Sequence, residues 1–208
     1  MRARAALATL LLATAGPACA QQGMDAATNE KFSRFVGSNK NYFDWLQVRL
    51  AQAEPVPLRE TCAAVKATKR IRLLVTKPPT FTDTPFPASG AWIEQLTVDR
   101  CGSEAVRSIL VDVRDSRAQA IPLLPGRTNA APLLQRDAAL PAEVAAKVKV
   151  NCKDRMYVVD TAIEGDARPG APWRETWTFM GCKGTQSQVA MTFTPDGNGG
   201  TNFQARAK

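Results

Sequence analysis

The stretch WIEQLTVDRC, residues 92–101, decides the fold of this chain because its pattern returns once, as WRETWTFMGC at residues 173–182. In both stretches a tryptophan is followed by glutamate two positions later, threonine five positions later and cysteine nine positions later. Each has a further cysteine upstream, Cys62 or Cys152, ahead of a run of basic and apolar residues. An internal repeat of this kind predicts two similar structural modules in tandem.

The number of cysteines predicts disulfide bonds. The chain has 5 cysteines, and removal of a signal segment that contains Cys19 leaves an even number. An even number of cysteines in an exported protein is typical of a disulfide framework. Of the three possible pairings, the repeat selects the one in which each module closes its own bridge, Cys62–Cys101 and Cys152–Cys182.

A disulfide between facing positions of two antiparallel strands would also fix the strand register. In the first module this register sets Lys69 opposite Glu94, and in the second it sets Tyr157 opposite Trp177. Opposite charges and apolar or aromatic side chains then meet, as cross-strand pairs prefer. We therefore expect each cysteine pair to join two neighbouring strands.

Residues 1–20 have the features of a cleaved signal peptide. Arginines at positions 2 and 4 precede an apolar run, and Ala18-Cys19-Ala20 is a small-residue cleavage site before Gln21. The run is too short to span a membrane as a helix. Acylation of Cys19, as in a lipoprotein, is the alternative.

The net charge of the remaining chain indicates which classes of binding partner it favours. Its 188 residues carry 25 basic and 19 acidic side chains and no histidine, for a net charge of +6. The basic residues are scattered, which is typical of a solvated surface and does not indicate a specific nucleic-acid site. The positive charge favours encounter with anionic envelope components or an acidic protein. No later segment approaches about 18 consecutive apolar residues, so we expect no transmembrane segment.

Helix and strand patterns follow the same order in both halves. In the first half we expect helices that begin at Asn29 and at Asn39 or Asn41, the second with Phe43, Leu46 and Leu50 inward. Strands follow at about residues 65–76, 91–101, 109–113 and 118–124. In the second half we expect short helices at 133–138 and 141–148, with Leu140, Val144 and Val148 aligned, then strands at 153–163, 173–182, 188–194 and 201–205.

These elements predict an α+β fold of two tandem modules. Each module consists of two short helices and a four-stranded antiparallel β-meander and is stapled by a disulfide. We assign residues 1–20 to the signal peptide, 21–125 to the first module and 126–208 to the second. This element order resembles that of the β-lactamase inhibitory proteins, in which two sheets form one concave, partner-binding surface. The resemblance covers the layout and no residue motif.

The residue types of the common catalytic sites are missing. Without histidine the usual serine and cysteine triads lose their base, and disulfide bonding would consume the thiols. There is no phosphate-binding glycine loop and no cluster of histidine and cysteine with metal-ligand spacing. We therefore expect no enzymatic activity, no catalytic residues, no metal and no cofactor.

Glu94 and Glu175 form the one constellation with catalytic potential. Each shares a strand face with a tryptophan, because Trp92 and Trp173 lie two positions away. Two carboxylates in apolar surroundings could serve as acid and base in a glycoside hydrolase. The competing interpretation is that each is a structural carboxylate, satisfied by a cation such as Lys69 or a hydroxyl. The repeat favours this second interpretation, because both modules keep the residue.

An aromatic and basic set in the second module is a candidate partner-binding surface. Its members are Arg155, Tyr157, Trp177 and Phe179. Exposed aromatic rings beside arginine are typical interface anchors. The same residues could equally form the face on which the helices pack, which is the usual role of aromatics in a half-buried sheet.

The sequence thus predicts an exported, non-enzymatic binding or accessory protein of the cell envelope, periplasmic or secreted, with an inhibitor-like role as one form of it. Its partner would be a protein or an anionic envelope component. The alternative is a carboxylate-dependent hydrolase that uses Glu94 and Glu175. A catalytic pair would have to line one cleft, whereas structural carboxylates would lie apart, each with its own hydrogen-bond donors.

Export predicts that the secreted protein begins at Gln21, because signal peptidase cleaves after small residues such as those at 18–20. Intact mass spectrometry of the secreted protein measures this directly. A mass that starts at Met1, or a lipid added at Cys19, would contradict the assignment.

Overall fold

The computed structural model describes residues 23–166, 168 and 170–208, and the predicted signal segment lies outside them. The described chain is an α+β protein in which helices precede two groups of strands. The helices are α1 (Ala26–Ser38), α2 (Lys40–Ala53), α3 (Val56–Thr61) and α4 (Pro132–Val150). The strands are β1 (Val65–Phe81), β2 (Pro87–Arg100), β3 (Ser103–Arg114), β4 (Arg117–Pro122), β5 (Tyr157–Glu164), β6 (Trp173–Gly181), β7 (Thr185–Pro195) and β8 (Thr201–Ala207).

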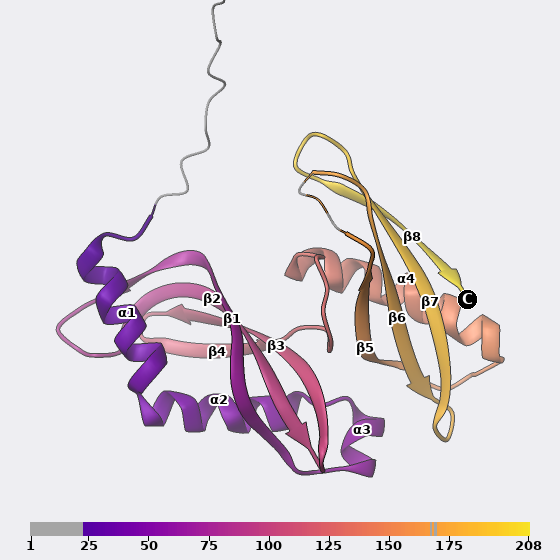
Figure 1. Ribbon diagram of the computed structural model, residues 1–208, viewed down its shortest axis with the longest axis horizontal. Helices are drawn as coiled ribbons and strands as arrows, with labels where there is room; N and C mark the ends of the chain where they lie inside the picture. Colours follow the sequence, from indigo (N-terminus) through magenta and orange to yellow (C-terminus); the bar gives the residue numbers. More distant parts are fainter. Residues whose placement is uncertain (1–22, 167, 169) are drawn as a thin grey trace, which may run out of the picture.

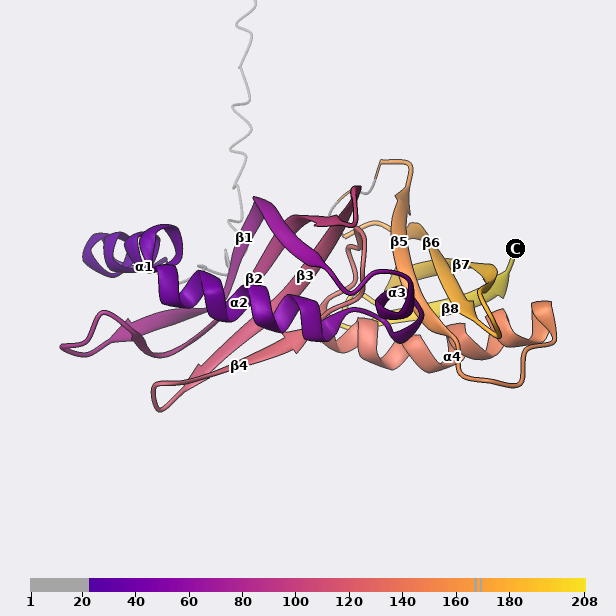
Figure 2. The same cartoon turned by 90° about the horizontal axis from the view of Figure 1, so that it is seen from below.

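The strands form two four-stranded antiparallel meanders, β1-β2-β3-β4 and β5-β6-β7-β8. We call them the first and the second sheet; they lie side by side along the long axis of the molecule (Figure 1). Helices α1 and α2 run across one face of the first sheet (Figure 2). Helix α4 packs on one face of the second sheet, so each sheet has its own hydrophobic core. We call the face of each sheet that lies opposite its core the outer face.

The first two helices begin at side chains that accept a backbone hydrogen bond. Asp25, and not Asn29, caps α1, because its carboxylate accepts from the Thr28 amide at 2.8 Å. Of the two predicted starts of α2, Asn39 and Asn41, the structure has Asn39, whose side chain accepts from the Tyr42 amide at 3.0 Å. The prediction that Phe43 points inward is wrong: Phe43 is 41% exposed, and Tyr42 is buried in its place.

The helical part of the second half differs from its prediction. The two short helices are one helix, α4, which continues through Pro141. Its buried residues are Gln135 and three alanines, Ala138, Ala142 and Ala146, and the alanines allow the helix to lie close to the sheet. Leu140, Val144 and Val148 lie on the opposite, exposed face. The short helix α3, after Pro55, was not predicted at all.

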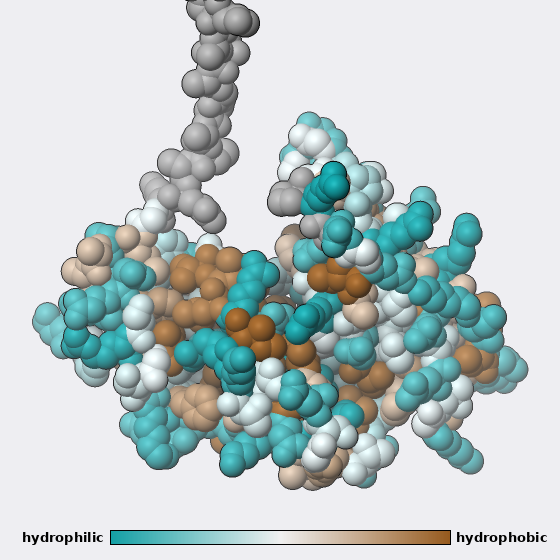
Figure 3. Space-filling view, viewed as in Figure 1, coloured by the Kyte–Doolittle hydropathy of each residue, from teal (hydrophilic) through white to brown (hydrophobic). Residues whose placement is uncertain are grey.

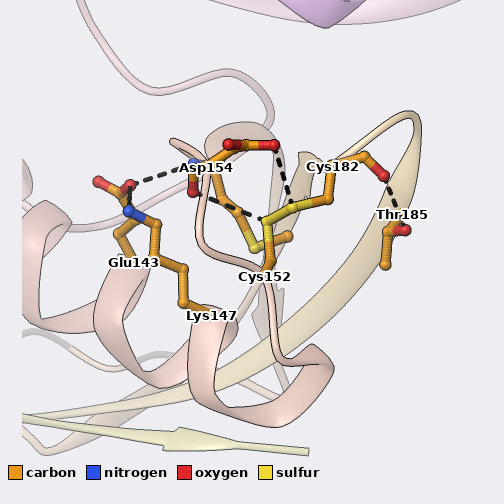
Figure 4. Close-up of a disulfide and its surroundings, with 7 residues drawn as sticks. Glu143, Lys147, Cys152, Asp154, Cys182 and Thr185 are labelled. Carbon is orange, nitrogen blue, oxygen red and sulfur yellow. Dashed lines mark hydrogen bonds and ion pairs between the residues drawn. A yellow bond between two sulfur atoms is a disulfide. The ribbon is translucent and has the colours of Figure 1, made fainter.

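The structure contains the disulfides Cys62–Cys101 and Cys152–Cys182, the pairs that the repeat selects. Each bridge joins a helix end to a hairpin turn. Cys152 follows the end of α4, and Cys182 accepts a hydrogen bond from the Thr185 hydroxyl in the turn between β6 and β7 (Figure 4). In the first half, Cys62 follows α3 and Cys101 begins the turn between β2 and β3.

The predicted strand register is wrong because the cysteines lie at helix ends and turns and not on neighbouring strands. Because the cysteines do not face each other across two strands, they do not set the pairing. Glu94 lies opposite Leu73 and not Lys69, and Trp177 lies opposite Thr161 and not Tyr157. Irregularities along β1, such as the one between Arg70 and Arg72, shift the first register further.

The segment between β4 and α4 binds both sheets. The Gly126 amide donates to the Val106 carbonyl of β3 at 3.0 Å, and the next amide, of Arg127, donates to the Thr161 carbonyl of β5 at 2.7 Å. Gly126 has a φ of +89°, and a Cβ at this position would lie 2.3 Å from the Thr161 carbonyl oxygen. Glycine is therefore required both by the backbone conformation and by the contact.

Substitution of Gly126 by alanine tests how much this contact stabilises the fold. We expect Gly126→Ala to lower the free energy of unfolding by about 2–5 kcal/mol, the sum of left-handed strain and overpacking. Gly102→Ala is the matched control, because Gly102 has a φ of +84° with nothing within 4 Å of its Cβ position. It should cost only the strain, about 1–2 kcal/mol. Equal urea midpoints for the two variants would show that the close contact with β5 contributes nothing.

Candidate partner-binding surface

Glu94 is fully buried in the first core and is held by a cation and a hydroxyl. Its carboxylate accepts from Arg70 Nε at 2.5 Å and from the Tyr42 hydroxyl at 2.7 Å. The Tyr42 oxygen in turn accepts from the Trp92 indole at 2.9 Å. Burial, followed by the negative charge of Glu94, raises the pKa of the Tyr42 hydroxyl above its usual range, so the hydroxyl remains a proton donor.

Glu175 is equally buried, in the second core, and its four donor groups are neutral. The indoles of Trp173 and Trp177 donate at 2.9 and 2.8 Å, one to each carboxylate oxygen. The segment before α4 provides the rest: the Thr128 hydroxyl at 2.7 Å and the Asn129 amide at 2.8 Å. We call residues 123–131, between β4 and α4, the inter-sheet segment. The Glu175 carboxylate ties this segment to the second sheet.

The structure does not bring the two glutamates together. They lie in different cores and bind different residues, and each is 0% exposed. The cation on Glu94 is Arg70 and not Lys69, because β1 pairs in another register. The two carboxylates are therefore separate, and each has its own set of hydrogen-bond donors.

The aromatic and basic set of the second module does not form one surface: two of its members are buried in the core and two lie at the surface. Trp177 and Phe179 are 0% and 1% exposed and pack in the core under α4, so their assignment to a binding surface is wrong. Arg155 and Tyr157 remain at the surface, where the guanidinium lies 5.2 Å from the ring centroid. This pair offers one cation–π contact and no wider surface.

The most distinctive surface lies on the outer face of the first sheet. Leu74 pairs with Ile93, Ile93 with Leu110, and Leu110 with Ile121, so one aliphatic residue from each strand stands in a single row. We call these four residues the aliphatic row. With strands about 4.8 Å apart the row is about 14 Å long. Leu74 is 38% exposed and the other three are partly exposed.

The beginning of α4 and the segment before it form a wall beside this row. Two adjacent hollows, of about 320 and 470 Å³, lie between wall and sheet and share Leu123, Pro132 and Gln135. Leu74 and Ile93 line the first hollow, Leu110 and Ile121 the second. We call the whole the row groove. Apolar surface gathers over β1 to β3 and extends toward the second half of the molecule (Figure 3).

The second sheet provides an internal comparison. When the sheets are aligned on the motifs Trp92-Ile93-Glu94 and Trp173-Arg174-Glu175, the row that corresponds to the aliphatic row is Glu164, Arg174, Thr192 and Gln204, again one residue from each strand. Every member of this row is polar or charged. The fold therefore accommodates polar residues at these positions, and the aliphatic row is specific to the first sheet.

Sequence reasoning missed the row groove because its four residues come from four strands. The alternation of β2 and β3 shows that Ile93 and Leu110 point away from the core, but only the register places them side by side. Leu133 extends the groove onto α4, whose exposed apolar side chains continue along the helix with Leu140, Val144 and Val148. The predicted alignment of these residues is correct, but they face solvent.

Other kinds of site find no support in the described residues. Among residues 23–166, 168 and 170–208, no group of three or more histidine, cysteine, aspartate or glutamate side chains could hold a metal ion. Within the same ranges no helix is long and apolar enough to cross a membrane. Comparison of the chain with protein-family models, characterised proteins and solved structures gives no match. The resemblance to the β-lactamase inhibitory proteins therefore remains one of element order.

Replacement of Glu175 by glutamine separates a structural from a catalytic carboxylate. Glutamine accepts through one oxygen only, and its NH₂ group would face an indole or amide donor. We expect a loss of about 1–3 kcal/mol in the free energy of unfolding, measured as a lower urea midpoint. Glu164→Gln, at a side chain 37% exposed on the same sheet, is the control and should change stability by less than about 1 kcal/mol. A stabilised Glu175→Gln variant would revive the catalytic interpretation.

Proposed function

We propose that this chain is an exported, non-enzymatic binding protein of the cell envelope that docks a partner protein in the row groove. In this proposal the two halves, 21–125 and 126–208, are diverged copies of one disulfide-stapled α+β module. The observation that carries the proposal is the aliphatic row, a continuous apolar strip on a sheet face whose counterpart in the second half is polar. Apolar strips with polar margins are typical of protein interaction sites.

The flanks of the groove favour an amphipathic segment with acidic margins. Arg72 lines one hollow and Arg136 the other, so each hollow has a cation at its border. The net charge of the mature chain has the same sign and favours encounter with an acidic partner. A row of about 14 Å corresponds to about nine residues of helix, or two to three turns with apolar side chains at helical spacing.

The buried carboxylates support binding over catalysis. Glu94 and Glu175 each tie a covering segment to its sheet, through Tyr42 of α2 in the first half and Thr128 before α4 in the second. A glycoside hydrolase would need both around one cleft. The two disulfides are compatible with an extracellular location, which is the environment that the proposal requires.

A charge placed in the aliphatic row should abolish capture of the partner. The mature protein, immobilised as bait in periplasmic extract, is compared with Leu110→Lys and with Thr192→Lys, the matched position of the second sheet. We expect a protein that wild type and Thr192→Lys retain and that Leu110→Lys retains at least about tenfold less, because a buried ammonium opposes an apolar contact. Quantitative mass spectrometry of the eluates measures the ratio.

Unfolding midpoints of both variants control for loss of the fold. Equal capture by all three baits, with the variants folded, would contradict a role for the row groove. Recovery of anionic lipid in place of a protein, or of a second copy of this chain, would contradict the choice of partner.

A further inference from the structure

The inter-sheet segment lies between two sheet edges and donates backbone hydrogen bonds to both. It runs antiparallel to β3: the Leu123 amide donates to the Ser108 carbonyl at 3.1 Å, and the Gly126 amide donates to the Val106 carbonyl. At Arg127 it bonds to Thr161 of β5 on its other side. The gap between β3 and β5 is therefore one strand wide at this point.

Only Gly126 and Arg127 of the inter-sheet segment lie between β3 and β5. Beyond Arg127 the space between these two strands is not filled by the segment. Thr128 and Asn129 turn into the second core to bind Glu175. Ahead of them lies a cleft of about 720 Å³ that is lined by the start of β3, the end of β5 and the inter-sheet segment. We call this cleft the edge slot.

Both walls of the edge slot present strand edges. Backbone groups of alternate residues face the same edge of a strand. On β3, Val106 and Ser108 bond to the inter-sheet segment, so the amide and carbonyl of Glu104, two residues before Val106, face the slot. On β5, Thr161 bonds to the segment, so the amide and carbonyl of Ile163, two residues after it, face the slot from the other side. Strand β4 covers β3 only from Ile109 to Arg114, so it leaves this part of the edge open.

The charge of the edge slot is opposite to that of the protein. Glu104, Asp160 and Asp166 line it together with one basic residue, Arg127, whereas the chain without residues 1–20 has a net charge of +6. Burial raises the pKa of the Asp160 carboxyl, opposed by the Thr161 amide and the charge of Arg107. Glu104 and Asp160 are both exposed, so a cation can reach them and be attracted by their charge.

We propose that the edge slot binds an extended, basic segment of a partner protein, which pairs with β3 on one side and β5 on the other and joins the two sheets. Backbone hydrogen bonds to two edges provide affinity, as in other cases of β-strand addition, and the carboxylates select lysine or arginine. The proposal is independent of the row groove.

A random nonapeptide display library, selected on the wild-type protein, tests the slot without knowledge of the partner. We expect enrichment of sequences with lysine or arginine among β-branched residues and without proline, because proline cannot donate to an edge. The best peptide is then synthesised and its dissociation constant measured by fluorescence anisotropy. Glu104→Lys should weaken binding at least about tenfold, whereas Glu30→Lys, the same charge change at an exposed site on α1, should not.

Amide hydrogen exchange locates the peptide. The Glu104 and Ile163 amides should exchange at least about tenfold more slowly with the peptide bound, and Leu110→Lys should leave its affinity unchanged, which separates this site from the row groove. Failure to enrich any sequence, equal affinity for Glu104→Lys and wild type, or exchange protection confined to other strands would each overturn the proposal.

Discussion

Two consecutive backbone amides, those of Gly126 and Arg127, hold the halves of this protein together. One bonds to β3 and the other to β5, and the absence of a side chain at Gly126 lets the segment lie directly against the β5 backbone. The next residues, Thr128 and Asn129, are fixed by the buried carboxylate of Glu175. The position of the wall beside the row groove, and the opening of the edge slot, both depend on this segment.

The two buried glutamates show how one position can be used in different ways. Glu94 binds the hydroxyl of Tyr42, so it anchors α2, and Arg70 provides the compensating charge. Glu175 has neutral donors and anchors the inter-sheet segment. A carboxylate at the same place in each sheet therefore fixes whatever covers the core. This role confines it to the interior and leaves the outer faces free to differ.

The sequence allowed the order of the strands, the two antiparallel meanders and the disulfide pairs to be predicted, because each depends on local patterns and on the repeat. Register and helix orientation were not predictable in the same way. The cysteines lie at helix ends and turns and so carry no register, and α4 buries its alanines in place of the larger Leu140 and Val144 because close approach to the sheet favours small side chains. The row groove depends on that register.

The strongest argument that the aliphatic row serves binding comes from within the molecule. Exposed apolar residues are common singly, and a fold can require them at a barrel seam or a sheet edge. Here the second sheet has the same strand order, and at the corresponding positions it carries Glu164, Arg174, Thr192 and Gln204. Since polar side chains satisfy the sheet there, the sheet alone does not require the leucines and isoleucines of the first sheet. The wall beside the row covers them in part, and the partner that we propose for the row groove would cover the rest.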